Sequence, residues 1–583
     1  MPDNPLHRVL YIDLTNQQYR VEEKPHLFEE SIGGTGVAIR LLEEECPPGI
    51  DPLGPENTII FAVGPLTGLF PLASKTVAMF KSPLTGNLGE SHAGGRSAVS
   101  LRLAGYGALM IKGASESPVY LSIHGDKVFF RDASALWGMA NSYTIGRVIR
   151  EREPGSGTRT IMRIGRAGEQ LVRYASVITE TYRHFGRLGL GAVFGSKKLK
   201  AIVISGNQSL EVANPKQYRK TYDEIFQAAV NSEVMQKYHQ VGTAENIEPL
   251  NAVGGLPTMN VKKSRFDSAS AISGEQMAQQ YLGRRIACAH CPIACIHIAA
   301  LREPYAQEPY FYKTSMISYD YEPIYAMGSM LGVSDSRGLL KLLDDADRLG
   351  VDVMSAGVVL AWATEAIEKG LIKSKDLAGA ELKWGDHQTY RRALKMLVEQ
   401  PNDLYRALAR GVEYASSQYG GVDFALAFGG NEMPGYHTGP ATYAGFLMSS
   451  RHSHLDSAGY SIDLNSNNPQ SASEISDALI AEETWRQILS STVTCFFARG
   501  VYTQERIAQI FDVAGCDVRP ELLLQIGGET LRRKYAFKLR EGFSPEKLRI
   551  PQRILETPSA SGIISESLLR ETVSHMNQKL TSL

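Results

Sequence analysis

Three cysteines lie within one eight-residue segment, Cys288-Ala-His-Cys291-Pro-Ile-Ala-Cys295. The whole chain of 583 residues has six cysteines, so half of them are gathered here. The first residues, Met1-Pro-Asp-Asn-Pro, lack the basic and apolar regions of a secretory signal, so we expect a reducing compartment. Closely spaced thiolates in such a compartment indicate a metal ion, an iron–sulfur cluster or a redox dithiol rather than a disulfide.

The spacing of these thiols favours an iron–sulfur cluster over zinc. A cubane cluster needs a fourth thiolate. No further cysteine follows at short spacing, so the residues alone leave three distant candidates open: Cys46, Cys495 and Cys516. The alternative is structural zinc, with His290 or His297 completing a set of three cysteines and one histidine.

Two other segments carry residue types suited to acid–base chemistry. Glu322 stands among aromatic residues in Tyr319-Asp-Tyr-Glu-Pro, where burial would raise its pKa, although a helix cap is an equal interpretation. The run Arg451-His-Ser-His454-Leu-Asp456 is typical of a metal or acid–base cluster, or of an ordinary loop.

Composition excludes several classes of protein. The net charge of −1 shows no excess of basic residues, which argues against a nucleic-acid-binding protein. No apolar run approaches the roughly 18 residues of a membrane span. The length is too great for one hydrophobic core. We therefore predict a soluble, cytoplasmic protein of several domains.

The elements that position these residues change in kind near residue 208. Residues 1–208 are rich in short β-branched or alternating runs, which predict strands at 9–14, 58–63, 108–112, 119–123 and 201–205, with helices at 35–45 and 142–152. Glycine clusters at 33–36, 86–89, 94–95 and 186–191 match no known phosphate loop. They indicate either tight turns or backbone that approaches a large phosphate-bearing cofactor.

Helical periodicity dominates from residue 209 onward. It predicts helices at 215–238, 334–349, 355–369, 389–399, 404–419, 474–490 and 504–514, with Gly350, Gly370 and Gly420 as C-caps. The cysteine segment is expected between two helical stretches, and the last 25 residues as a surface tail with one short helix. We predict three domains: 1–208, 209–410 and 411–583.

Taken together, these segments resemble the aldehyde:ferredoxin oxidoreductase family, whose members hold tungsten, or sometimes molybdenum, on two pterin dithiolenes beside a 4Fe–4S cluster. The matching pieces run from residue 33 to 495: 33–36, 64–68, 80–86, 103–106, 164–169, 186–197, the cysteine segment, Tyr321-Glu322, 347–352, 433–435 and Cys495. The resemblance implies an α+β fold. An N-terminal β-rich domain of two sheets would form a base for the pterin cofactor, followed by two mainly α-helical domains.

The resemblance also implies which residues bind the cofactors. The cluster ligands would be Cys288, Cys291, Cys295 and Cys495. A first pterin-contacting pattern corresponds to Asp347, Gly350, Val351 and Asp352. A second, with the family's Asp, Gly and Leu all changed, runs from Ser490 through Thr494 to Cys495. Lys75 stands where the family has an arginine between cluster and pterin. The backbone that holds a magnesium ion bridging the pterin phosphates corresponds to His92, Ala93 and Gly94, and to Arg187, Leu188 and Gly189.

The activity that the resemblance implies is oxidation of an aldehyde to a carboxylic acid, with electrons passing through the cluster to ferredoxin or a ferredoxin-like subunit. Glu322 would be the base for water, and His454 the hydrogen-bond donor to the aldehyde oxygen. One alternative is a tungsten subunit like that of benzoyl-CoA reductases, which carries a metal-binding cysteine where Glu322 stands. Another is a non-catalytic iron–sulfur electron-transfer protein. In the family, a glutamate and a histidine bind an iron that bridges two subunits, and Lys341 falls near the place of that glutamate. Whether this chain forms a homo-oligomer is therefore left open.

Overall fold

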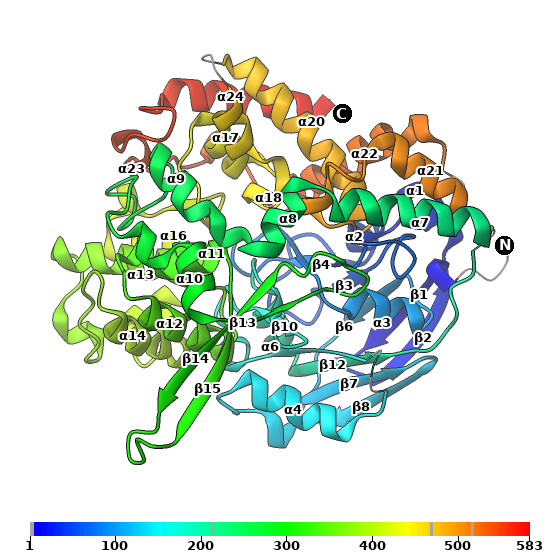
Figure 1. Cartoon of the computed structure of the whole chain (residues 1–583), viewed down its shortest axis with the longest axis horizontal. Coiled ribbons are helices and arrows are strands. Elements are labelled where there is room, and N and C mark those ends of the chain that lie inside the picture. The colour runs from blue at the N-terminus through cyan, green and yellow to red at the C-terminus, as the bar shows by residue number, and fades with distance from the viewer. Residues whose placement is uncertain are drawn as a thin grey trace.

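The computed structural model describes residues 5–155, 157, 159–212, 214–466, 470–514 and 518–582 (Figure 1). Two six-stranded sheets occupy the N-terminal part, and the rest of the described chain is mainly helical. This is the α+β architecture that the resemblance predicts. Cys516 lies outside the described residues. No helix of the described residues is long and apolar enough to cross a membrane.

The first sheet has the strand order β2-β1-β6-β3-β4-β5. Its only parallel pair in the described chain is β1 with β6, which starts at Val9 opposite Ala108. Every residue of β3 and β4 is buried, because α2 packs on these strands. The strands are β1 (Arg8–Asp13), β2 (Gln18–Glu23), β3 (Ile59–Ala62), β4 (Thr76–Lys81), β5 (Leu88–Ala93) and β6 (Ala108–Lys112).

The second sheet has the order β11-β10-β9-β12-β7-β8, and β11 packs against β5 of the first sheet. Phe61 of the first sheet meets Phe185 of the second edge to face, so the two sheets share one core. The strands are β7 (Val119–His124), β8 (Lys127–Asp132), β9 (Thr160–Ile164), β10 (Val177–Thr179), β11 (Arg183–Phe185) and β12 (Leu199–Ser205). The helices of this half are α1 (Pro25–Ser31), α2 (Gly34–Glu45), α3 (Ser97–Leu103), α4 (Ser142–Arg152), α5 (Arg166–Glu169) and α6 (Leu190–Ser196).

The cysteine loop lies in a third, three-stranded sheet, β13-β14-β15. The loop joins β13 (Leu282–Ile286) to β14 (Ile296–Pro304), and β14 pairs with β15 (Tyr312–Tyr319) in a hairpin that projects from the body of the molecule (Figure 1). The loop does lie between helical stretches, α10 (Gly274–Tyr281) before it and α11 (Tyr321–Met327) after it, but the three strands next to it were not predicted. Leu282 to Ile286 is a short strand directly after α10, and β14 and β15 stabilise each other by pairing that local periodicity does not reveal.

The helical half encloses one large core. Leu360 and Met576 belong to the same hydrophobic cluster, although they lie on opposite sides of the predicted domain boundary at residue 410. The division of the helical half into two domains therefore stays a prediction. The α-helices of the helical half up to residue 420 are α7 (Pro215–Val230), α8 (Glu233–Gln240), α9 (Ile247–Val253), α10 (Gly274–Tyr281), α11 (Tyr321–Met327), α12 (Ser336–Leu349), α13 (Val353–Glu368), α14 (His387–Glu399), α15 (Asp403–Leu408) and α16 (Val412–Tyr419). Those that follow are β16 (Ala427–Phe428), β17 (Asn431–Glu432), α17 (Pro440–Met448), α18 (His454–Ser457), α19 (Gly459–Asn465), α20 (Ala472–Ser491), α21 (Gln504–Ala514), α22 (Leu523–Arg540), α23 (Arg553–Glu556) and α24 (Glu566–Ser582).

Three helical predictions need correction. The segment 215–238 forms two helices that break at Asn231 and Ser232. The segment 404–419 also forms two: α15 ends at Leu408, and Gly411, whose φ of 100° is not helical, directly precedes α16. The C-terminal residues are not a surface tail: they form the 17-residue helix α24, which buries Leu569 and Met576 in the core.

Candidate functional site

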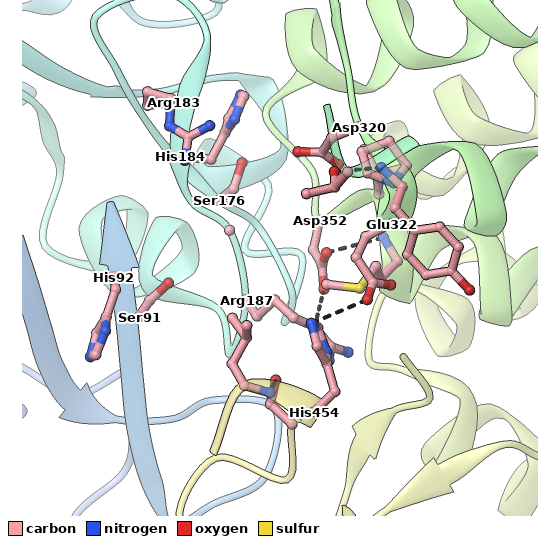
Figure 2. Close-up of a pocket in the computed structure, with 18 of the residues that line it drawn as sticks. Ser91, His92, Ser176, Arg183, His184, Arg187, Asp320, Glu322, Asp352 and His454 are labelled. Atoms are coloured by element: carbon pink, nitrogen blue, oxygen red, sulfur yellow. Dashed lines mark hydrogen bonds and ion pairs between the residues drawn. The ribbon is translucent and has the colours of Figure 1, made fainter. Parts of the chain in front are cut away.

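A cavity of about 330 Å³ lies where the two N-terminal sheets meet the helical half. Figure 2 shows its walls: Ser91 and His92 come from β5, Arg183 and His184 from β11, and Asp320 and Glu322 from the start of α11. Asp352 begins α13, and His454 begins α18. Residues more than 350 positions apart in the chain thus face one space.

Glu322 and His454 face each other in this cavity. Glu322 Oε1 lies 3.2 Å from His454 Nε2. The other carboxyl oxygen accepts a hydrogen bond of 3.1 Å from the backbone N–H of Gly435, which fixes the side chain. His454 is held by a capping box at the start of α18, in which Ser453 and Asp456 satisfy each other's backbone N–H groups.

Burial keeps both groups uncharged near neutral pH. It raises the pKa of Glu322 to about 8, since the nearby Arg187 offsets only part of the desolvation. It lowers the pKa of His454 to about 3, and Arg187 adds to this effect. Among the described residues, His454 Nδ1 has no hydrogen-bond partner, and Glu322 Oε1 has none beyond its 3.2 Å contact with His454 Nε2. The pair therefore offers an exchangeable proton and free polar atoms to a molecule in the cavity.

Arg187 crosses the cavity to Asp352. Its Nε lies 3.1 Å from Asp352 Oδ2, and Nη2 donates to the carbonyl of Glu432 at 2.6 Å. Asp352 caps α13 by accepting from the N–H of Met354, and it also accepts from the hydroxyl of Ser355. Arg187 Nη1 is buried and has no partner among the described residues, so it can bind an anionic or carbonyl group.

Asp347 lies at the other end of the same wall. Its Oδ1 is 3.2 Å from His184 Nε2, and Oδ2 accepts from the hydroxyl of Tyr143 at 3.2 Å. Asp347 and Asp352 bracket Gly350, which ends α12 in the left-handed conformation with φ of 77°. A Cβ at Gly350 would lie 2.9 Å from the backbone of Gly165, so only glycine fits without a shift.

The chain repeats this helix end at residues 490–495. The N–H of Val351 bonds the carbonyl five residues before it, and the N–H of Thr494 does the same. Val493 takes the left-handed place of Gly350, with φ of 56°, which costs a valine about 1–2 kcal/mol. The second pattern therefore keeps its backbone geometry although its side chains are changed.

Both helix ends dock on the N-terminal half in the same way. The N–H of Ser176 bonds the carbonyl of Gly350, and the N–H of Asp352 bonds the carbonyl of Tyr174. At the second end, the N–H of Lys75 bonds the carbonyl of Val493, and the N–H of Cys495 bonds the carbonyl of Leu72.

Gly34 is one of the glycines that make this docking possible, because a Cβ there would lie 2.1 Å from the carbonyl oxygen of Ser490. The cluster at 33–36 thus serves close packing against α20.

The segment from Leu72 to Lys75 also brings the fourth cysteine to the cysteine loop. The N–H of Leu72 bonds the carbonyl of His290, while the carbonyl of Leu72 accepts from Cys495. Burial and the neighbouring thiols, Cys495 first among them, raise the pKa of Cys295 to about 12. Cys46 lies elsewhere, buried beside Arg540 and Glu541. The structure therefore groups four cysteines: Cys288, Cys291, Cys295 and Cys495.

Gly94 and Lys75 lie directly against this group. A Cβ on Gly94 would lie 2.7 Å from Cys288 Sγ and 3.5 Å from Lys75 Nζ. The N–H of Ala289 bonds the carbonyl of Gly95, which fixes the loop on the end of β5. Lys75 therefore stands next to Cys288, and its place between cluster and pterin stays a prediction. The thiols raise the pKa of the buried Arg183 against the effect of burial.

The zinc alternative finds no support in the histidines. Both ring nitrogens of His297 already face backbone carbonyls, those of Cys295 and Gln240, each at 3.1 Å. His290 is exposed. Within the described residues, no three His, Cys, Asp or Glu side chains form a group that could hold a single metal ion.

The predicted cofactor residues divide into two sets. Some line the cavity: His92, Arg187, Leu188, Asp347, Val351 and Asp352. The others are not among the lining residues: Lys75, Ala93, Gly94, Gly189, Gly350, Ser490 and Thr494. The side chain of His92 is engaged by Glu90 at 2.7 Å, and the carbonyl of Leu188 accepts from Ser82 at 2.8 Å. One lone pair of the Leu188 carbonyl remains for a cation.

Sequence reasoning missed three charged residues of this site. Arg183 lines the cavity, and its Nε is buried without a partner among the described residues. Glu90 also lines the cavity and pairs with Lys534 of α22 at 2.6 Å, with both side chains buried. No local sequence pattern marks these residues. Glu90 and Lys534, for example, are far apart in the sequence and come into contact only in the folded chain.

Comparison with known proteins gives a consistent result. The family model described as the aldehyde ferredoxin oxidoreductase N-terminal domain matches residues 9–206, and the model of domains 2 and 3 matches residues 220–580. A tungsten-containing aldehyde ferredoxin oxidoreductase of Thermococcus kodakarensis is 32% identical over 95% of this chain and 92% of its own. That of Pyrococcus furiosus is 31% identical over the same shares.

One further relative and one solved structure are also similar to this chain. The aliphatic sulfonate oxidoreductase WOR-like subunit of Pyrococcus furiosus is 30% identical over 71% of this chain and 68% of its own. Among solved structures, the active-site complex BamBC of benzoyl coenzyme A reductase has the same fold, with a TM-score of 0.83, 22% identity, and coverage of 99% of this chain and 94% of that one. With two family models that together match most of its length, the chain belongs to the aldehyde ferredoxin oxidoreductase family.

Proposed function

We propose that this oxidoreductase carries a tungsten or molybdenum bis-pterin cofactor and oxidises an aldehyde to a carboxylic acid, passing electrons through a 4Fe–4S cluster to ferredoxin or a ferredoxin-like subunit. The observation that carries the proposal is the pair of Glu322 and His454, 3.2 Å apart in a cavity that the first docked helix end also lines with Asp347 and Asp352. The names of the tungsten-containing relatives support the choice of metal and substrate.

The residues present fit such a cofactor. Arg183 and Arg187 each direct a buried, unpartnered N–H group that suits the phosphate and carbonyl oxygens of a pterin. Asp347 and Asp352 offer acceptors for its ring N–H groups. The four grouped cysteines supply the thiolates of one cubane cluster. When bound, the metal and its pterins would accept the two electrons that leave the substrate.

Glu322 would act as the base in its ionised form. Oxidation consumes one water, and an aldehyde plus water gives a carboxylic acid, two protons and two electrons. Glu322 Oε1 has no hydrogen-bond partner in the described chain beyond its contact with His454 Nε2 and would take a proton from that water. His454, neutral because burial lowers its pKa to about 3, would donate its N–H to the aldehyde oxygen.

The test is reduction of a viologen dye by the anaerobically purified protein in the presence of simple aldehydes. We expect activity with the natural chain, and its loss in Glu322→Gln with the metal content retained. Turnover of aromatic-ring reduction without aldehyde oxidation would contradict the proposal and favour the benzoyl-CoA-reductase-like alternative.

A further inference from the structure

Aromatic rings form a continuous wall of the cavity beside Glu322 and His454. The ring of Tyr436 lies 5.0 Å from that of His454 and stacks on Tyr460 at 4.3 Å with an interplanar angle of 20°. Tyr321 packs against the same ring at 5.3 Å. All three tyrosines line the cavity, so the reacting pair stands at one edge of an aromatic surface.

A second pair of rings extends this surface. Tyr238 of α8 lies 4.4 Å from Phe497, which belongs to the short 3-10 helix Phe496–Ala498, and both line the cavity. Tyr238 and Tyr460 both line the cavity. We call these five residues the aromatic wall: Tyr238, Tyr321, Tyr436, Tyr460 and Phe497.

Three charged residues that line the cavity come from other elements than the aromatic wall. Arg183, Arg187 and Asp352 come from β11, the loop after it and the start of α13, where the proposed pterin contacts lie. The neighbours of His454 on its other side are the rings of Tyr436 and Tyr460. A substrate whose carbonyl lies beside the contact of Glu322 with His454 would therefore have the rest of its body next to the aromatic wall.

On this geometry we propose that the aromatic wall selects aryl aldehydes, whose planar ring packs on the faces and edges of Tyr436, Tyr460 and Phe497. This inference rests on the proposed function and names the substrate class of the same site. A planar ring gains offset-stacked or edge-to-face contacts that a saturated ring of the same size lacks.

The test compares benzaldehyde with cyclohexanecarbaldehyde, which has nearly the same volume but a puckered, saturated ring. We expect kcat/KM of the holoenzyme to favour benzaldehyde by about 10-fold, which corresponds to one or two aromatic contacts. In Tyr460→Leu and in Phe497→Leu the preference should fall to about 3-fold or less. Tyr414→Leu, a tyrosine outside this cavity, is the matched control and should keep the preference of the natural chain.

Product binding gives a readout that does not depend on turnover. Benzoate should inhibit or bind the holoenzyme about 10-fold more tightly than cyclohexanecarboxylate, and Tyr460→Leu should remove most of that difference. Equal kcat/KM and equal binding for the two rings would overturn aryl selection while leaving aldehyde oxidation in place. If neither aldehyde, nor any short aliphatic aldehyde, reduces the dye, the proposed function fails and aryl selection fails with it.

Discussion

Replacing Glu322 by glutamine should stop catalysis and at the same time stabilise the protein. Glutamine keeps the shape and the hydrogen bond from the N–H of Gly435, but it cannot take a proton. General-base catalysis contributes about 10²- to 10⁴-fold, so we expect kcat/KM for an aldehyde to fall by that factor with metal and iron content unchanged.

The gain in stability follows from the buried carboxyl. Its pKa is about 8 in the folded chain, against 4.5 for an ordinary glutamate. At pH 7 the unfolded carboxyl is ionised and the folded one is protonated, which costs the natural protein about 3 kcal/mol. Since the folded pKa is raised, this cost appears as pH rises above 4.5 and reaches its limit above pH 8.

Differential scanning calorimetry of the holoenzyme can measure this gain. With an unfolding entropy of about 2.1 cal/mol/K per residue over 583 residues, 3 kcal/mol corresponds to a rise in Tm of about 2–3 °C at pH 7. At pH 4.5 the rise should fall below about 1 °C. Glu571→Gln, at an exposed position of α24, should change neither Tm nor activity. A lower Tm for Glu322→Gln at pH 7, or activity within about threefold of the natural enzyme, would refute the reasoning.

Three further predictions concern the titration of the base, the cluster and the docked helix ends. The value of kcat/KM should rise with pH through about 8 and then level off, because the ionised form of Glu322 is the base; a profile that falls over this range would contradict that role. Cys495→Ser should lose the iron–sulfur absorption and most of the iron, whereas Cys46→Ser should keep both, as measured by visible spectroscopy and iron analysis. Gly350→Ala should destabilise the protein by about 2–4 kcal/mol and lower its cofactor content, because both a left-handed φ and a backbone contact oppose a Cβ. Gly370→Ala, which has a similar φ and open space around it, should cost about 1 kcal/mol and leave cofactor content unchanged.

Local sequence patterns correctly predicted several short elements whose hydrophobic periodicity is regular along their whole length. The predicted helix 142–152 and strand 108–112 match α4 and β6 residue for residue, and 504–514 matches α21. The C-terminal helix was predicted as short and superficial, because its many serine, threonine and glutamate residues obscured a regular apolar spacing at Leu569, Val573 and Met576.

The site depended on contacts that no local pattern contains. The resemblance pointed to Cys495, but the reason that it reaches the cysteine loop is the shared segment at Leu72, more than 200 residues before the loop. Val493 in the left-handed conformation could not be predicted either, since a β-branched residue argues against it. The surrounding docking fixes that conformation.

Elemental analysis of the anaerobically purified protein tests the central proposal most directly. We predict about one tungsten or molybdenum atom and about four iron atoms per chain, with the pterin recovered on denaturation. Iron without either heavy metal, from cells supplied with both, would contradict the proposed enzyme. Zinc as the sole metal would contradict both the cluster and the pterin cofactor.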